Sequence, residues 1–282
     1  MSKEMKNLPP QYAAFVFLAV LLLSTFSAPL VPLDTLDADE PPAVEEGFTP
    51  MFNGDDLSGW HGDSRVWSVE SDESDTGNTG DTGDTDSTRD NNSTRDNNST
   101  RGIIVGRVKE GLPDDGTFLI YDKPVENFII RFDYKISAGG NSGLQYRSIE
   151  PAEKAPWRLS GYQADFDGEA FYSGVLYRFE EVRRGFISSL GEFTLILPGG
   201  ESQTLEHFAD SEDIKAAIKI GDWNSYEIIA VGPYLEQKIN GVTTTRAVDL
   251  DNEMPRGDKL GFQCHGSMVM EVKIKNLRIK EL

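Results

Sequence analysis

Short runs that alternate apolar and polar residues dominate the chain from Phe48 onward. Runs such as "RVWSVE", "ENFIIRFDYKI" and "NSYEIIAVG" are separated by Gly, Asn, Asp and Pro. An alternation with a period of two predicts β-strands, because successive side chains of a strand point to opposite faces. Many regularly spaced strands predict an all-β sandwich or jelly roll.

Two local signals add a hairpin and a helix to these strands. "INGVTTTRAV" predicts a hairpin that turns at Asn240 and Gly241, since this residue pair suits tight turns. "SEDIKAAIKI" places Ile214, Ala217 and Ile218 on one side and begins with acidic residues, which is typical of a short amphipathic helix. The chain is therefore expected to contain at most one or two short helices.

A repetitive acidic segment interrupts the strands. "TGNTGDTGDTD" repeats every three residues, and "DSTRDNNSTRDNNSTRG" repeats every six. Strand-like runs flank the segment, so we interpret residues 71–101 as a disordered insertion inside one domain, which loop-closure entropy tolerates. Its closely spaced carboxylates Asp81, Asp84 and Asp86 lack the alternation and the distal glutamate of a calcium loop.

The composition of residues 1–46 indicates a targeting segment followed by a linker. Lysines precede the apolar run "AAFVFLAVLLLSTFSA", which is short for a membrane span and suits a secretory signal. We expect a signal peptide or an uncleaved anchor over residues 1–28 and an acidic, Pro-rich linker over residues 29–46. The domain of residues 47–282 is expected to be secreted, periplasmic or part of the cell envelope, and only an uncleaved anchor would tie it to the membrane.

Composition excludes several classes of function. The formal net charge of -20 argues against nucleic acid as a partner, because phosphates would be repelled. The single cysteine, Cys264, allows no intrachain disulfide and is expected to be a buried apolar residue. Only three histidines occur, which excludes a histidine-rich metal site.

Three strand-like runs share one construction. In "NSGLQYRS", "GYQADFD" and "GFQCHG", apolar side chains alternate with polar side chains that carry distinctive chemistry. If the three strands are neighbours, one face presents Gln145, Arg147, Gln163, Asp165, Gln263 and His265. Any half-solvated sheet has a polar face, but such faces usually carry Thr, Lys and Glu rather than this set. Tyr177 and Trp157 are expected either to stack on a sugar ring or to pack in the core.

These runs also carry a resemblance to a known family. "GFTPMFNGDDLSGW", "NSGLQYRS", "GYQADF", "SGVLY", "RRGF" and "GFQCHGSMVMEVKIKNLRIKEL" resemble, in order, the motifs of the 3-keto-disaccharide hydrolase domain family. The resemblance covers about residues 47–282. It implies a concanavalin A-like jelly-roll β-sandwich in a secreted bacterial protein that cleaves glycosides carrying a ketone at C3 of the sugar. The insertion at 71–101 and the charged run after Tyr177 depart from the family pattern.

The resemblance also implies a set of site residues. The family pattern carries over onto Asn141, Ser142, Gly143, Gln145, Arg147, Gln163, Asp165, Gly174, Tyr177, Arg184, Gly185, Gln263 and His265. We expect substrate to be bound by Asn141, Gln145, Gln163, Gln263, Trp157 and Arg184.

The ketone suggests a mechanism other than that of an ordinary glycosidase, which needs two opposed carboxylates. A base removes the acidified proton at C2, the group at C1 leaves, and water adds to the product. The expected base is His265 or Asp165, Arg147 with help from Gln163 stabilises the enolate, and Tyr177 or the other member of the base pair protonates the leaving oxygen.

Three alternatives stay open. No cofactor is required, but a divalent cation held by Asp165 and His265 would replace Arg147 in stabilising the enolate. The same residues would also suit a carbohydrate-binding module without catalysis. A third class is a structural or adhesion protein of the cell surface that uses the repeat as a spacer.

Overall fold

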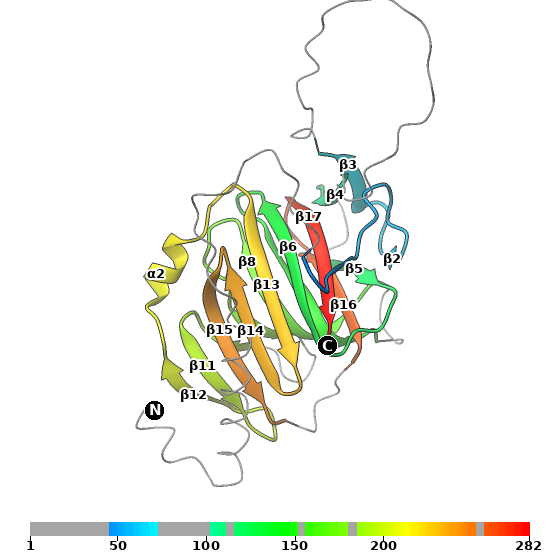
Figure 1. Ribbon diagram of the computed structural model, residues 1–282. Coiled ribbons are helices and arrows are strands. Elements are labelled where there is room, and N and C mark those ends of the chain that lie inside the picture. Colours follow the sequence, from blue (N-terminus) through cyan, green and yellow to red (C-terminus); the bar gives the residue numbers. More distant parts are fainter. Residues whose placement is uncertain (1–44, 73–101, 111–115, 152–155, 180–184, 252–256) are drawn as a thin grey trace, which may run out of the picture.

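Two β-sheets pack face to face in the computed structural model, which describes residues 45–72, 102–110, 116–151, 156–179, 185–251 and 257–282 (Figure 1). This arrangement confirms the expected jelly-roll β-sandwich. The predicted signal peptide, nearly all of the linker and the repeats lie outside the described residues. Within those residues, no helix is long and apolar enough to cross a membrane.

The larger sheet has ten strands in the order β12-β11-β15-β14-β13-β6-β17-β4-β3, with β1 paired to β17. Its neighbouring strands are antiparallel except for the parallel pair of β11 and β15. The strands are β1 (Thr49–Pro50), β3 (Trp67–Ser71), β4 (Gly102–Val108), β6 (Phe128–Ile136), β11 (Glu192–Ile196), β12 (Ser202–His207), β13 (Asn224–Val231), β14 (Tyr234–Ile239), β15 (Val242–Asp249) and β17 (Met270–Glu281).

The smaller sheet has seven antiparallel strands in the order β10-β9-β8-β7-β16-β5-β2. Its strands are β2 (Trp60–His61), β5 (Thr117–Tyr121), β7 (Asn141–Ile149), β8 (Ser160–Asp167), β9 (Leu176–Phe179), β10 (Gly185–Ser188) and β16 (Lys259–Cys264). Strands β7 and β8 are sequence neighbours, whereas β16 joins them from near the end of the chain.

Aromatic residues fill the space between the sheets. The ring of Tyr134 on β6 lies 4.3 Å from that of Phe166 on β8, and Phe132 lies 5.1 Å from Phe262 on β16. Burying each such side chain stabilises the fold by about 1.5–3 kcal/mol. Cys264 is fully buried in the same core, as expected, and burial raises the pKa of its thiol.

The predicted hairpin and helix both form. Asn240 and Gly241 connect β14 to β15 with φ angles of 50° and 79°, the left-handed conformation that a tight hairpin turn requires. Helix α2 (Ser211–Ala216) is capped by Asp210, whose side chain accepts a hydrogen bond from the Glu212 amide at 2.8 Å. Ile214 anchors the helix to the body of the sandwich.

The strands that flank the repetitive segment are direct neighbours. β3 and β4 pair antiparallel, and Ser71 lies opposite Gly102 in the register. The repeat therefore connects two positions that are already adjacent across a strand pair.

Candidate active site

Polar side chains of three adjacent strands gather on the face of the smaller sheet that points away from the core. The three strands are neighbours in the order β8-β7-β16, which meets the condition stated for a shared polar face. Tyr162, Leu144 and Phe262 point into the core, so the alternate residues Gln163, Gln145 and Gln263 point outward. These three glutamines are nevertheless only 3%, 0% and 2% exposed. A merely solvated sheet face would expose them, which favours a built site.

A chain of hydrogen bonds fixes the orientation of the three amides. Gln145 Nε2 donates to Gln163 Oε1 at 3.0 Å, and Gln163 Nε2 donates to Gln263 Oε1 at 3.0 Å. Gln163 Nε2 also donates to Asp165 Oδ1. Gln163 is thus the central member, and both hydrogens of its amide group are engaged. The carbonyl oxygen of Gln263 faces Gln163, which leaves its NH2 group at the opposite end of that amide.

Gly143 makes the contact between Gln163 and Gln263 possible. These two residues lie on strands on either side of β7, and Gly143 is the β7 residue paired with Asp165. A Cβ atom at Gly143 would lie 2.6 Å from Gln163 Cγ and 2.8 Å from its Nε2. The absent side chain therefore provides the gap through which the amide of Gln163 reaches across β7.

Asp165 is the ionisable group of this site. Its side chain is 6% exposed, and burial raises the pKa of its carboxyl to about 8. The hydrogen bond from Gln163 lowers this pKa and the charge of Asp167 raises it, but both effects are smaller than the loss of hydration. A carboxyl group with a pKa near neutrality can give and take protons at physiological pH.

The backbone of Asp165 is held from both sheets. Its amide donates to Val175 O at 3.3 Å, and its carbonyl oxygen accepts from Gly174 N at 2.8 Å. The hydroxyl of Tyr226, which comes from the larger sheet, also donates to this carbonyl oxygen at 3.3 Å. The carboxyl group is therefore presented from a backbone with little freedom to shift.

Two more predicted residues lie on the same face. Tyr177 on β9 is the register partner of Gln163, and its ring meets Phe186 edge-on at 5.3 Å. Because Leu176 points into the core, Tyr177 points outward beside the amide row. Asn141 begins β7, two residues before Gly143, and pairs with Asp167 of β8.

Arg147 lies at an irregular point of β7. Strand alternation would put it beside Gln145, but Arg147 has a φ of 47° and lies where the β7–β8 register shifts. A left-handed residue in a bulge breaks the period of two. Arg147 instead lines a separate cavity of about 380 Å³ together with Glu126, Asn127, Gly232, Gly257 and Asp258.

The remaining predicted residues lie at the margins of the site. His265 follows β16 on an exposed turn, where its Nδ1 atom lies 2.7 Å from the carbonyl oxygen of Gly266. Trp157 is half-buried, and its carbonyl oxygen accepts from the Phe118 amide at 3.1 Å. Arg184 lies outside the described residues.

A cation site was a second expectation at Asp165 and His265. Among the residues that the structure describes, no group of three or more His, Cys, Asp or Glu side chains is arranged to hold a metal ion. Asp165 and His265 remain the two side chains that the sequence suggested for this purpose.

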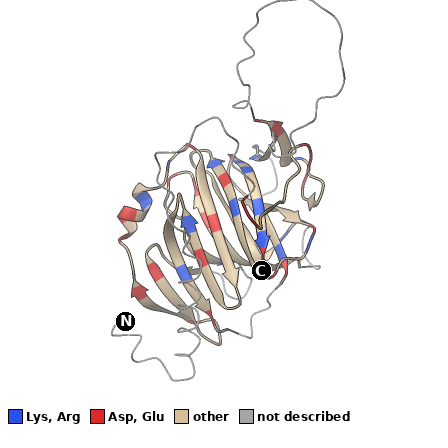
Figure 2. Cartoon of the chain, in the orientation of Figure 1, with Lys and Arg blue, Asp and Glu red and all other residues tan. Residues whose placement is uncertain are grey.

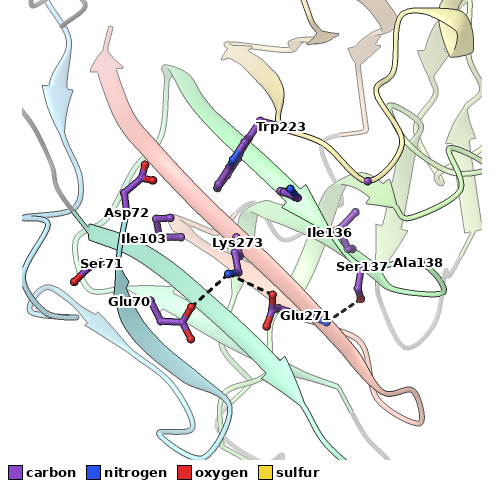
Figure 3. Close-up of a pocket in the computed structure, with 12 residues that line it drawn as sticks. Glu70, Ser71, Asp72, Ile103, Ile136, Ser137, Ala138, Trp223, Glu271 and Lys273 are labelled. Carbon is purple, nitrogen blue, oxygen red and sulfur yellow. Dashed lines mark hydrogen bonds and ion pairs between the residues drawn. The ribbon is translucent and has the colours of Figure 1, made fainter. Parts of the chain in front are cut away.

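A larger cavity, of about 810 Å³, lies on the outer face of the opposite sheet (Figure 3). Three of its charged side chains pair with one another, because Lys273 lies 3.4 Å from Glu70 and 3.5 Å from Glu271. The ring of Trp223 is covered by the ammonium of Lys275 at 4.6 Å. Figure 2 shows the same mixture of both charges along the strands of this sheet. Such mutual pairing is typical of a solvated sheet face, and the site on the smaller sheet is therefore the stronger candidate.

Comparison with known proteins gives one family match. The model of the 3-keto-alpha-glucoside-1,2-lyase-like domain matches residues 47–280. A search of curated proteins finds no match. Among solved structures, a candidate glycosyl hydrolase from Parabacteroides distasonis ATCC 8503 is 23% identical with a TM-score of 0.48, over 84% of this chain and 94% of that one. The carbohydrate-binding module CBM66 from Bacillus subtilis is 14% identical with a TM-score of 0.41, over 63% of this chain and 86% of that one.

Proposed function

The chain belongs to the 3-keto-alpha-glucoside-1,2-lyase-like domain family, and from this premise we propose that it cleaves 3-keto-glycosides by elimination across C1 and C2. The observation that carries the proposal is the buried carboxyl group of Asp165, whose pKa of about 8 suits proton transfer. The substrate is a glycoside whose sugar carries a ketone at C3. The apolar N-terminal run supports a site of action outside the cytoplasm.

Asp165 is the proposed base. At pH 7 about one tenth of a carboxyl group with this pKa is ionised, and the ionised form is a much stronger base than an ordinary aspartate. It removes the proton at C2, which the neighbouring ketone acidifies. The electron pair of that C–H bond forms the C2–C3 double bond of an enolate, and the negative charge moves to the ketone oxygen.

The amide row stabilises that charge. Gln163 uses both amide hydrogens on Asp165 and Gln263, so it positions these two groups rather than contacting the substrate. The NH2 group of Gln263 is the proposed donor to the enolate oxygen. In this proposal the NH2 group of Gln263 stabilises the enolate, the role first expected of Arg147, which lines a different cavity.

The second half of the reaction expels the leaving group. The enolate electrons return to form the C3 carbonyl and a C1–C2 double bond, and the bond between C1 and the leaving oxygen breaks. Tyr177, beside Gln163 on β9, is the proposed donor of a proton to that oxygen. Water then adds across the C1–C2 double bond, with hydroxyl at C1 and hydrogen at C2, so that the net reaction is hydrolysis.

The test is release of p-nitrophenol from its 3-keto-glucoside, with the unoxidised glucoside as the comparison substrate. We expect release from the keto compound only, and a loss of about 10²–10⁴-fold in Asp165→Asn. Asp133→Asn is the matched control, because Asp133 lies on β6 of the opposite sheet and binds Asn276 at 2.6 Å. Equal rates in the wild type and Asp165→Asn would contradict the proposal.

Further experiments test whether the C2–H bond breaks, which residue acts as the base and whether the reaction needs a cation. A substrate carrying deuterium at C2 should react more slowly, since the C2–H bond breaks. Loss of activity in Asp165→Asn with retention in His265→Ala assigns the base to Asp165, and the reverse result assigns it to His265. EDTA treatment tests the cation alternative directly.

A carbohydrate-binding module without catalysis is the second candidate. The three ordered amides favour it, because fixed donors and acceptors recognise sugar hydroxyls as well as enolates. Binding of glucosides combined with survival of the 3-keto-glucoside would establish this function instead.

A further inference from the structure

Three aromatic side chains form a continuous group at the edge of the smaller sheet. Phe186 on the edge strand β10 stacks on Tyr172, with ring centroids 5.8 Å apart and ring planes at 16°. Phe186 also meets the ring of Tyr177, at 5.3 Å and 80°. We call Tyr172, Tyr177 and Phe186 the aromatic edge.

The aromatic edge is exposed to an extent that packing does not explain. Phe186 is 56% exposed and Tyr172 is 46% exposed, and the adjacent Phe171 is 67% exposed. Single exposed aromatic residues are common, but contiguous exposed apolar patches mark sites of interaction. Stacked rings that remain in water therefore indicate a surface that a ligand covers.

A rigid turn presents these rings. The carboxylate of Asp167, at the end of β8, accepts hydrogen bonds from the amides of Phe171, Tyr172 and Ser173 at 2.9, 3.0 and 2.9 Å. The hydroxyl of Ser173 adds a further bond at 2.7 Å. A turn held this firmly keeps the Tyr172 ring in place before a ligand arrives, which lowers the entropic cost of binding.

The aromatic edge is continuous with the candidate active site. Phe186 pairs with Tyr177, Tyr177 with Gln163, and Gln163 with Gln145, so one register row crosses four strands. Adjacent strands lie about 4.8 Å apart, which places β9 and β10 at roughly 5 and 10 Å from β8. A group linked to a sugar whose C2 lies beside Asp165 is within reach of these rings.

We propose that the aromatic edge is the subsite for the leaving group, which has a flat apolar face. This inference rests on the proposed function for its place beside Asp165. The shared ligand chemistry is a ring whose C–H or aromatic face stacks on Phe186 and Tyr172, as in an aromatic aglycone or a second pyranose. Tyr177 joins the two parts of the site. Its ring contacts Phe186, and it is the register partner of Gln163 on the neighbouring strand.

The test measures binding of uncleaved, unoxidised glucosides by titration calorimetry, so it does not depend on catalysis. The probes are methyl glucoside, phenyl glucoside and maltose, and the variants are Phe186→Ala and Phe186→Leu. The matched control is Trp223→Ala, because Trp223 is an aromatic residue that directly precedes β13 and lines the cavity on the opposite sheet. We expect Phe186→Ala to bind phenyl glucoside, maltose or both about fivefold more weakly than the wild type. The affinity of Phe186→Ala for methyl glucoside, and the affinities of Trp223→Ala for all three ligands, should equal those of the wild type.

The outcomes are distinct. Weakening confined to phenyl glucoside assigns an aromatic leaving group, and weakening confined to maltose assigns a sugar. Phe186→Leu should lose most of the same affinity, since it keeps bulk but lacks a ring. The inference is overturned if wild-type protein binds the methyl and phenyl glucosides and maltose equally well, or if Phe186→Ala weakens all three equally. A protein that shows this selectivity but cleaves no 3-keto-glucoside refutes the proposed reaction, and the aromatic edge then remains as a ring-binding subsite of a sugar-binding site.

Discussion

Gln163 and Gln263 hydrogen-bond to each other at 3.0 Å across the intervening strand β7, through the gap left by Gly143. The same amide nitrogen of Gln163 donates to the buried carboxyl group of Asp165. A glycine on one strand thus sets the geometry of three side chains on two others.

Replacing Gly143 with alanine should disrupt the amide row. The new Cβ would lie 2.6 Å from Gln163 Cγ, so we expect a loss of about 1–3 kcal/mol in the free energy of unfolding and a loss of most activity. Urea denaturation and release of the aglycone are the measurements. In the double variant Gly143→Ala/Gln163→Ala the clash with the Gln163 side chain is removed, although the approach of the new Cβ to Ala164 O at 2.9 Å remains. The double variant should therefore lose less free energy of unfolding than the two single variants lose in sum, while its activity stays low. If the losses in the free energy of unfolding of the two single variants simply add in the double variant, Gly143 does not serve to make room for the Gln163 side chain.

Replacing Gln163 with leucine should shift the pH dependence of the reaction. The amide of Gln163 lowers the pKa of Asp165, so its loss raises that pKa further. With Asp165 as base, wild-type kcat/KM should rise with pH through an apparent pKa of about 8, and the midpoint for Gln163→Leu should lie higher. A profile that falls through this range would instead make Asp165 the acid.

The stability of the protein should also report the buried carboxyl group. The pKa of Asp165 is raised on folding, so between about pH 4 and pH 8 the folded chain holds a proton that the unfolded chain has lost. The contribution of the neutral Asp165 carboxyl group to the free energy of unfolding is fully present below about pH 4 and is lost as the pH rises through about 8. Asp165→Asn, which keeps an oxygen to accept from Gln163, should therefore raise the melting temperature more at pH 8 than at pH 5. An equal change at both values would show that the group does not titrate in this range.

Shortening the repeat should leave the fold intact. Ser71 and Gly102 are already register partners, so a short turn can connect β3 to β4. We expect replacement of residues 73–101 by a tight turn to keep the melting temperature within a few degrees, because the closure entropy of a long loop depends only weakly on its length. Unfolding of the shortened chain in circular dichroism would contradict the interpretation of the segment as an insertion.

The sequence by itself determined the strands and the character of their faces. Alternation in "GYQADFD" separated Tyr162 and Phe166 from Gln163 and Asp165, and the structure places the first pair in the core and the second pair outside it. The turn at Asn240 and Gly241 and the helix capped by Asp210 were also predictable, because φ preferences and capping are local. The edge strands β10 and β12 carry weaker alternation, and β12 did not stand out in the sequence.

Tertiary structure decided which polar residues meet and which of them change their chemistry. Alternation assumes an unbroken strand, and at Arg147 a left-handed backbone interrupts that regularity. It left His265 on the same face as Gln263, although the strand ends before it. The pKa of Asp165 depends on how much water reaches it, and the bond between Gln163 and Gln263 depends on bringing β16 beside β7. Burial and long-range strand order are properties of the packed chain, and a local pattern of residues does not contain them.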